Sequence, residues 1–442
     1  MLKSYQKHSL VTRISQIITL TFSTVLTAPT LKNIVALLLA MLCLTGISSV
    51  RHLYDCFLGT FQSKTLNSYY HTLEIVGAKL NKLEVCVLYQ LWQLPQLTEL
   101  LAQYPLLFLV DDTLQPKFGQ KFAHVKVLHD HARHRGQEFV NAHDFVTLAL
   151  AFPLRKPHEP QSVQYFMVPF ACHMYQPDGD SKLKMVADMA QQALQVIGDQ
   201  QHIILECDSW YPKKDVLDFV KDHGNVDFIA NIRKDTALYQ LPQRTGRPGR
   251  PRKYGQKFKS TEIALTDQDD HYAVGMTKCM TKLFGQAVWI IRSQNRHEGE
   301  RLFISTLPAQ DLPELTPHKG GFWRILDYYD QRWKIETYFY EIKKFWSFGE
   351  YQVRSQNKIE GLHFIANLAY LLTQLLPQIQ PDWQELQEQG TSARKNMLSH
   401  AITAERIFTS LALSAQKHKN SRVILQFILD MGSRTTKNKQ IL

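Results

Sequence analysis

The sequence predicts an α/β protein in which strands alternate with helices, with a helical region before them and a β-rich insertion among them. Residues 1–95 carry apolar side chains at three- and four-residue spacing, which is typical of helices. Leu106–Thr113 and His202–Tyr211 are short apolar runs that lead into acidic residues, and a helical pattern over Leu183–Gly198 lies between them. Strand-like runs that alternate with a helix indicate an α/β core.

Changes in this patterning predict the boundaries of the segments. The helical start covers residues 1–95, and the first part of the core covers 96–227. Short strand-like runs separated by charged or glycine-containing turns predict a β-rich insertion over 228–312. Helical patterns then return, so that 313–380 is expected to complete the core and 381–442 to form a helical C-terminal region.

The composition is that of a folded and basic protein. Apolar residues make up 44% of the 442 residues and aromatic residues 11%, which argues against a disordered or fibrous chain. The formal net charge of +11 favours a polyanionic partner, because Lys and Arg neutralise phosphates, although basic proteins without such a partner also occur. The six cysteines show no zinc-ligand spacing, and they predict reduced thiols in a cytosolic compartment.

One apolar stretch raises the question of a membrane span. Ile34–Val50 carries no charged residue, but it is slightly shorter than the ~18–20 residues that cross a bilayer. Polar and small residues dilute its last third, and no single signal-peptide core precedes it. We therefore expect a buried helix and no membrane partner, with a membrane span as the alternative.

The end of the helical region contains a possible DNA-reading motif. Gly46–Leu73 divides into two short helical patterns around a glycine-containing connection. A helix-turn-helix would place Lys64–Tyr69 at the start of a recognition helix. An ordinary helical hairpin explains the same pattern, and the sequence slightly favours the hairpin.

The most specific pattern lies near residue 336. On an α-helix at ~100° per residue, Tyr329, Arg332, Glu336 and Lys343 project within a stripe about 60° wide. A carboxylate, a tyrosine and two cations are poor core material, and a solvated polar face would explain them in isolation. Their spacing, Tyr-(2)-Arg-(3)-Glu-(6)-Lys, and the flanking YYDQRWKIETYFYEIKK resemble the signature of bacterial insertion-sequence transposases of the DDE class.

The resemblance implies a ribonuclease H-like catalytic core with three metal-binding acids. Glu336 is the third acid, and the first two are each expected at the end of a strand. The family's D-T pattern points to Asp112, with Asp111 as the less favoured choice, and its D-S-x-Y pattern points to Asp208, with Glu206 as the less favoured choice. Carboxylates suit magnesium, which prefers hard oxygen ligands, so two Mg²⁺ ions are expected, with Mn²⁺ as a substitute.

The resemblance also implies DNA contacts on the same segment. Tyr329, Arg332 and Lys343 are expected to hold DNA near the cleaved end, because a guanidinium binds a phosphate bidentately and an ammonium acts as a point charge. Lys344 is a neighbouring candidate. The helical residues 1–95 are the expected N-terminal DNA-binding domain.

The insertion carries further candidates for DNA contact. Residues 244–259 are strongly basic, and their repeated G-R-P resembles the core of minor-groove AT-hook segments, although a solvated loop explains them equally well. Trp289 is a candidate for stacking on a flipped base, with a core tryptophan as the favoured alternative. The basic candidates are Arg247, Arg250, Arg252 and Lys253.

Together these patterns predict a cut-and-paste transposase. It is expected to bind transposon ends, cleave DNA by metal-dependent phosphodiester hydrolysis and join the 3′ ends to target DNA by transesterification. Double-stranded DNA is the expected partner, a homodimer is expected in the synaptic complex, and the expected location is the cytoplasm of a bacterium, associated with the nucleoid. The alternatives are a non-transposing ribonuclease H-like nuclease and a catalytically silent DNA-binding protein.

Overall fold

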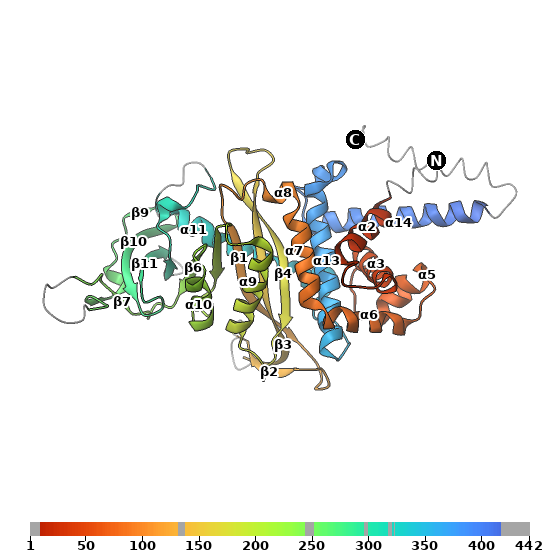
Figure 1. Ribbon diagram of the computed structural model, residues 1–442, viewed down its shortest axis with the longest axis horizontal. Helices are drawn as coiled ribbons and strands as arrows, with labels where there is room; N and C mark the ends of the chain where they lie inside the picture. Colours follow the sequence, from red (N-terminus) through yellow and green to blue (C-terminus); the bar gives the residue numbers. More distant parts are fainter. Residues whose placement is uncertain are drawn as a thin grey trace. The chain divides into compact units, whose positions relative to one another are not determined.

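A computed structural model describes residues 9–130, 138–243, 252–295, 299–316, 321 and 323–416 (Figure 1). The chain divides into two compact units, and neither of them is one continuous segment. The helical unit comprises Met1–Ala78, Ile342–Val353 and Asn357–Leu442. The sheet unit comprises Lys79–Glu341 and Arg354–Gln356.

The sheet unit is built around one mixed sheet. Among the described residues, twelve strands join this sheet, most of them in the order β2-β3-β1-β5-β6-β12-β11-β10-β7-β8, with β4 beside β3 and β9 beside β10. The neighbours β1, β5 and β6 are parallel, whereas β1 and β3 are antiparallel. The predicted α/β class is confirmed. The strands are β1 Leu106–Pro116, β2 Lys126–His129, β3 Phe139–Arg155, β4 Val163–Met174, β5 Ile203–Cys207, β6 Val226–Ile232, β7 Leu238–Tyr239, β8 Lys257–Phe258, β9 Asp267–Gln268, β10 Tyr272–Thr281, β11 Ala287–Asn295 and β12 Gly299–Ser305.

The central strands are buried on both faces. All five residues of β5 are buried, as are the first five of β1. Strands of this kind read as continuous apolar runs because helices cover both faces of the sheet. The helices of this unit are α7 Leu80–Trp92, α8 Pro95–Thr98, α9 Lys182–Ile197, α10 Lys214–Asp222, α11 Trp323–Tyr329 and most of α12 Trp333–Trp346.

Helix α9 has the boundaries that its sequence predicts. The Ser181 hydroxyl caps its first turn by accepting a hydrogen bond from the backbone N–H of Lys184. Gly198 ends the helix with a φ of +82°, a conformation that glycine adopts without strain. This cap fixes the position of Lys182, which begins the helix and reaches the sheet.

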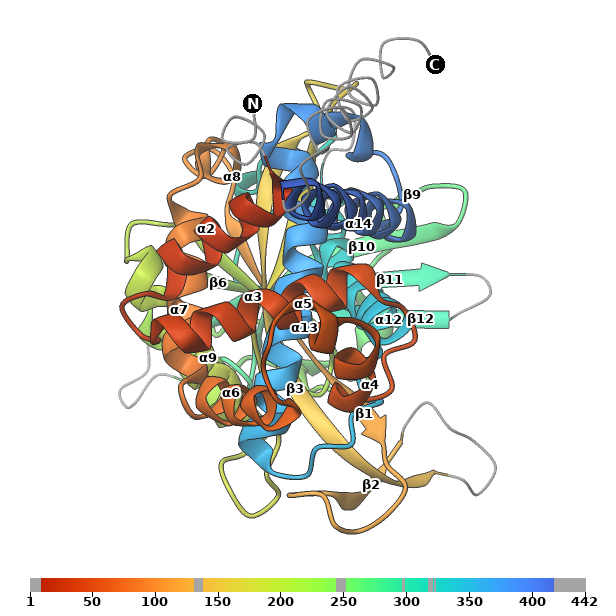
Figure 2. The same ribbon diagram turned by 90° about the vertical axis from the view of Figure 1, so that its right-hand side faces the viewer.

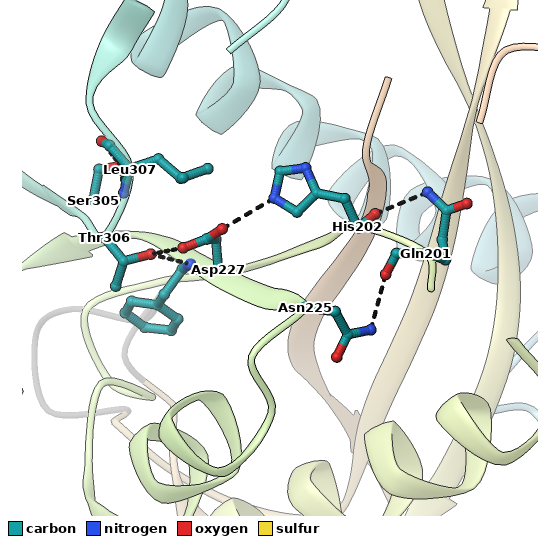
Figure 3. Close-up of polar contacts among 8 residues, drawn as sticks. Gln201, His202, Asn225, Asp227, Ser305, Thr306 and Leu307 are labelled. Atoms are coloured by element: carbon teal, nitrogen blue, oxygen red, sulfur yellow. Dashed lines mark hydrogen bonds and ion pairs between the residues drawn. The ribbon is translucent and has the colours of Figure 1, made fainter. Parts of the chain in front are cut away.

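The strands of the predicted insertion continue the sheet of the core. Strand β12 pairs with β6, and β11 and β10 follow it outwards. A polar network at the junction holds the strands in register (Figure 3). The Thr306 hydroxyl donates to Asp227 at 2.6 Å and accepts from the backbone N–H of Phe228 at 2.9 Å, while His202 pairs with Asp227 at 3.0 Å. The starts of β5 and β6 are thereby tied to the end of β12.

The helical unit holds the apolar segment that raised the question of a membrane span. Figure 2 shows its helices α2, α3, α6 and α14 toward the viewer. Ile34–Leu42 is buried along α3, so a buried helix is confirmed for this part of the segment. The helices are α2 Leu10–Phe22, α3 Ala28–Cys43, α4 Val50–Leu53, a π-turn at Tyr54–Leu58, α5 Gly59–Phe61, α6 Leu66–Ala78, α13 Gln356–Ile379 and α14 Thr391–Gln416.

Helix α13 is a long, buried helix of this unit. Among the described residues, it alone is long and apolar enough to cross a bilayer, and 94% of its most apolar stretch is buried inside the protein. Burial of this extent is the usual state of a core helix. All six cysteines lie in the described parts of the chain, and none of them forms a disulfide.

The pair of helices proposed as a helix-turn-helix differs from its predicted form. The connection between α5 and α6 contains no glycine, because Gly59 lies inside the preceding helical stretch. Tyr69 is fully buried, and its hydroxyl accepts a hydrogen bond from Gln62. Tyr69 therefore stabilises the helix pair, whereas Lys64 is exposed. A recognition role for α6 stays a prediction.

A buried lysine contacts the end of α3. Lys395 on α14 is only 2% exposed, and its ammonium donates to the carbonyl oxygens of Met41 and Leu44. Carbonyls at the end of a helix lack partners within the helix and carry the negative end of its dipole. Burial nevertheless lowers the pKa of Lys395 from 10.5 to about 8.

We expect Lys395 to make the helical unit more stable as pH rises from about 8 to 10.5. In this window the unfolded chain binds a proton at Lys395 that the folded chain has released, so folding gains about 3 kcal/mol. Below this window the folded chain must bury a protonated Lys395, and the full cost of that burial lowers its stability. Chemical denaturation of the wild type and Lys395→Met across the window measures the effect, and an unchanged difference between their free energies of unfolding would contradict it.

Candidate active site

Two adjacent aspartates on β1 point to opposite faces of the sheet. Successive side chains of a strand alternate, so Asp111 and Asp112 cannot face the same helices. The strand does not end at these acids, because its antiparallel pairing with β3 continues to Pro116. The prediction that the first acid ends its strand is therefore wrong. The parallel pairing with β5 does stop just before Asp111.

Asp111 lies on the face that meets the signature segment. Its Oδ2 accepts a hydrogen bond from Nη1 of Arg332 at 2.9 Å, and its Oδ1 accepts one from the backbone N–H of Asp112 at 2.9 Å. Burial raises the pKa of Asp111 to about 7, Arg332 lowers it, and the carboxylates of Asp208 and Asp112 raise it further. The surroundings of Asp111 therefore favour additional positive charge.

Asp208 comes directly after the last residue of β5. The parallel pairing between β1 and β5 ends at Val110 and Cys207, so Asp111 and Asp208 are the next two residues in the same register. Residues in register on parallel strands have their side chains on the same face of the sheet. The backbone N–H of Trp210 donates to Asp208 Oδ1 at 2.9 Å, which fixes the turn after the strand. Asp208 follows a strand as the sequence predicts.

The signature residues lie at a junction of helices and not on one continuous α-helix. A 3₁₀ turn, Asp330–Arg332, separates α11 from α12, which corrects the predicted single stripe. Residues three apart eclipse in a 3₁₀ turn, so the guanidinium of Arg332 lies 5.7 Å from the ring centroid of Tyr329. The turn buries Arg332, which is 9% exposed, and its Nη2 donates to Glu336 Oε1.

Asp112 belongs to a different network, on the face covered by α9. Its Oδ2 accepts from the ammonium of Lys182 at 2.8 Å, and its Oδ1 accepts from the Tyr211 hydroxyl at 2.6 Å. Lys182 also pairs with the buried Asp144 on β3, whose pKa is raised to about 7 by burial and by Asp112. The negative charge of Asp112 is thus already balanced by the ammonium of Lys182.

The structure therefore places Arg332 between Asp111 and Glu336, and Asp208 lies near enough to Asp111 to raise its pKa. Asp111, the less favoured choice of the sequence, shares this face, whereas Asp112 does not. Glu206, the alternative to Asp208, is fully buried, and neither of its oxygens has a hydrogen-bond partner in the part of the chain that the structure describes. Burial raises the pKa of Glu206 well above its ordinary value, so its neutral form is favoured.

The carboxylates of Asp111, Asp208 and Glu336 are suitable ligands for a hard divalent cation. In the observed arrangement, however, they do not form a metal site. Within the described ranges, no group of three His, Cys, Asp or Glu residues could hold a metal ion. Three carboxylates are nevertheless the ligands that magnesium prefers, and a positive guanidinium already stands between Asp111 and Glu336. An ion bound here would have to compete with Arg332 for the oxygens of Asp111 and Glu336.

The predicted DNA contacts lie in several places. Arg252 and Lys253 are exposed, whereas Arg247 and Arg250 fall outside the described residues. Trp289 is half-buried on β11, and the ammonium of Lys278 lies 5.4 Å from its ring centroid. Each of these roles stays a prediction.

Lys343 and Lys344 occupy the last turn of α12, which is assigned to the helical unit. Lys344 is exposed, and Lys343 is half-buried. Their predicted role in holding DNA stays open.

An aromatic residue that the sequence reasoning missed lies beside Asp208. Trp210 is 39% exposed, and the ammonium groups of Lys213 and Lys182 lie 3.9 and 5.3 Å from its ring centroid. Exposed aromatic rings beside cations are used by nucleic-acid-binding proteins for stacking. Its position two residues after the predicted acid was the available signal.

Comparison with known proteins finds similarity to a transposase family over part of the chain. Residues 174–372 match the family model described as "Transposase DDE domain", a range that contains Asp208 and Glu336. Over this range the chain is similar to transposase DDE domains. Among solved structures, a cryo-EM structure of the piggyBac transposase synaptic complex with hairpin DNA aligns with 94% of this chain and 80% of its own, at 10% identity and a TM-score of 0.42. None of the curated proteins matches the sequence.

Proposed function

We propose that the protein is a cut-and-paste DNA transposase of the insertion-sequence type. It cleaves DNA at the ends of its element and joins the freed 3′ ends to target DNA. The observation that supports this proposal is that Arg332 links Glu336 on α12 to Asp111 on β1, beside the strand that Asp208 follows, and that Asp208 and Glu336 both lie within the range matched by the DDE family model. A ribonuclease H-like core and the Y-R-E-K signature are parts of the same proposal.

In this proposal Asp111, Asp208 and Glu336 hold two Mg²⁺ ions, for which Mn²⁺ substitutes. When bound, such ions activate the attacking oxygen and stabilise the leaving 3′ oxygen. The protein's part is to fix the positions of the carboxylates. Asp111 and Asp208 follow the carboxyl end of the buried parallel pairing between β1 and β5, and Glu336 projects from the first turn of α12. Asp111 takes the place that the D-T pattern assigned to Asp112.

Double-stranded DNA is the proposed partner, as transposon end and as target. The net charge of +11 supports a polyanionic partner. Tyr329, Arg332 and Lys343 contact the end, with Lys344 beside them, and two transposase chains form the synaptic complex in the bacterial cytoplasm. The proposed contacts from the insertion are Arg247, Arg250, Arg252, Lys253 and Trp289.

Excision from a donor plasmid tests the function. The gene's own flanking DNA is placed on either side of a marker, and the full chain is supplied from a second plasmid. We expect donor molecules that have lost the marker, and new insertions bordered by short target duplications. Glu336→Gln should give neither product, because it removes one metal-binding charge and keeps the shape of the side chain.

Two outcomes would contradict the proposal. Cleaved donor without insertions would identify a nuclease of the same fold that lacks strand transfer. Equal excision by the wild type and Glu336→Gln would exclude catalysis by these acids. Sequencing of the flanking DNA for short inverted repeats defines the ends before the assay.

A further inference from the structure

A cationic side chain of the protein lies between two of the three proposed metal ligands. Arg332 binds Asp111 through Nη1 and Glu336 through Nη2, so one guanidinium bridges two of the proposed metal ligands. Asp111 and Glu336 lie far apart in the sequence, and Arg332 is the residue that links them. A guanidinium stays protonated in proteins, so this bridge carries a full positive charge.

The bridge leaves part of Arg332 unsatisfied. Its Nε is buried and has no hydrogen-bond partner among the described residues. A buried donor without a partner is unfavourable, so the guanidinium is not in its best possible environment. Arg332 is therefore held by the two acids and by Tyr329, while its Nε is left without a partner in the described part of the chain.

We propose that Arg332 is an internal counter-ion, which occupies the place of a divalent cation between Asp111 and Glu336 and must withdraw before the metal binds. This inference rests on the proposed function only for the identity of the metal-binding acids. The same charge cannot share that space with a second cation, because the two would repel each other at close range. The resting chain is therefore held in a state of low metal affinity.

The proposal puts two interactions of Arg332 in order: it first binds the acids and then binds a DNA phosphate. The sequence predicts that Arg332 binds a DNA phosphate, whereas the structure shows it bound to two carboxylates. A phosphate accepts two parallel hydrogen bonds from a guanidinium, as a carboxylate does. A phosphate at a DNA end can therefore replace the two carboxylates as the partner of Arg332. Asp111 and Glu336 are then released to bind a metal ion when DNA is present.

Manganese binding to the full chain without DNA tests the proposal. Free Mn²⁺ is measured by electron paramagnetic resonance during titration of the wild type, Arg332→Gln and Lys213→Gln. The control removes a positive charge that acts on Asp208 but does not bridge the acids. We expect Arg332→Gln to bind Mn²⁺ at least about tenfold more tightly than the wild type, and Lys213→Gln to differ by less than about threefold.

The outcomes separate this inference from the proposed function. If Arg332→Gln binds Mn²⁺ no more tightly than Lys213→Gln, the counter-ion role is overturned. If Glu336→Gln and the double variant Arg332→Gln/Glu336→Gln bind as tightly as their parents, the acids do not hold metal and the proposed function fails as well. Should Arg332→Gln not fold, as judged by circular dichroism, Arg332→Met is measured with the same expectation, because methionine also removes the guanidinium and its positive charge.

Discussion

Asp111→Asn should reduce excision by about a thousandfold or more, whereas Asp112→Asn should stay within about tenfold of the wild type. Asp111 shares a face with Asp208 and the Arg332–Glu336 pair, and asparagine keeps its shape but loses its charge. Asp112 already binds Lys182 and Tyr211, and in asparagine the amide oxygen can still accept from Lys182 while the amide NH₂ donates to the Tyr211 hydroxyl. The donor-plasmid assay measures both variants side by side.

The reverse result would restore the choice made from the D-T pattern. An inactive Asp112→Asn with an active Asp111→Asn would show that β1 turns its other face to the substrate. Loss of the Asp112–Lys182 ion pair is expected to lower stability by roughly 1–3 kcal/mol, so folded protein must be quantified for both variants. Equal loss of activity in two folded variants would contradict the distinction between the two faces.

Gly361→Ala should destabilise the helical unit by about 3 kcal/mol or more. A Cβ atom at Gly361 would lie 2.3 Å from the carbonyl oxygen of Leu73, and one at Gly77 would lie 1.9 Å from that of Asn357. Helices α6 and α13 thus approach through backbone atoms that no rotamer change can move. In an open helix the same substitution would instead stabilise by up to about 1 kcal/mol, so the sign itself is informative.

A matched glycine in the same unit provides the control. A Cβ atom at Gly390 would meet no atom within 4 Å, so Gly390→Ala is expected to change the free energy of unfolding by less than about 1 kcal/mol. Denaturant unfolding of the two variants and the wild type compares them directly. Equal stability of Gly361→Ala and Gly390→Ala would show that α6 and α13 do not pack this closely in solution.

Local patterns predicted most of the elements. Apolar spacing indicated the helical start and the end of α9 at Gly198, and runs of β-branched and aromatic residues indicated the strands around Asp208. Glu336 was found because four residues at fixed spacing lie within one short segment. Such signals are legible in a sequence because neighbours along the chain create them.

The geometry of Arg332 could not be predicted in this way. Its spacing to Tyr329 and Glu336 suits a regular helix, and only the observed 3₁₀ turn directs it inward. Its partner Asp111 comes from a strand far away in the sequence, so the ion pair depends on how the sheet and the signature segment pack. No local pattern contains that information.

The sequence by itself determined the class of most elements and their order, and it singled out Asp208 and Glu336 as candidate acids. Tertiary structure decided that Asp111 rather than Asp112 joins them, and that an arginine bridges two of the three. The physical reason is strand geometry, because side chains of neighbouring residues on β1 point to opposite faces of the sheet. The groups that each face meets depend on the pairing of β1 with β5 and on the helices that pack on the two sides.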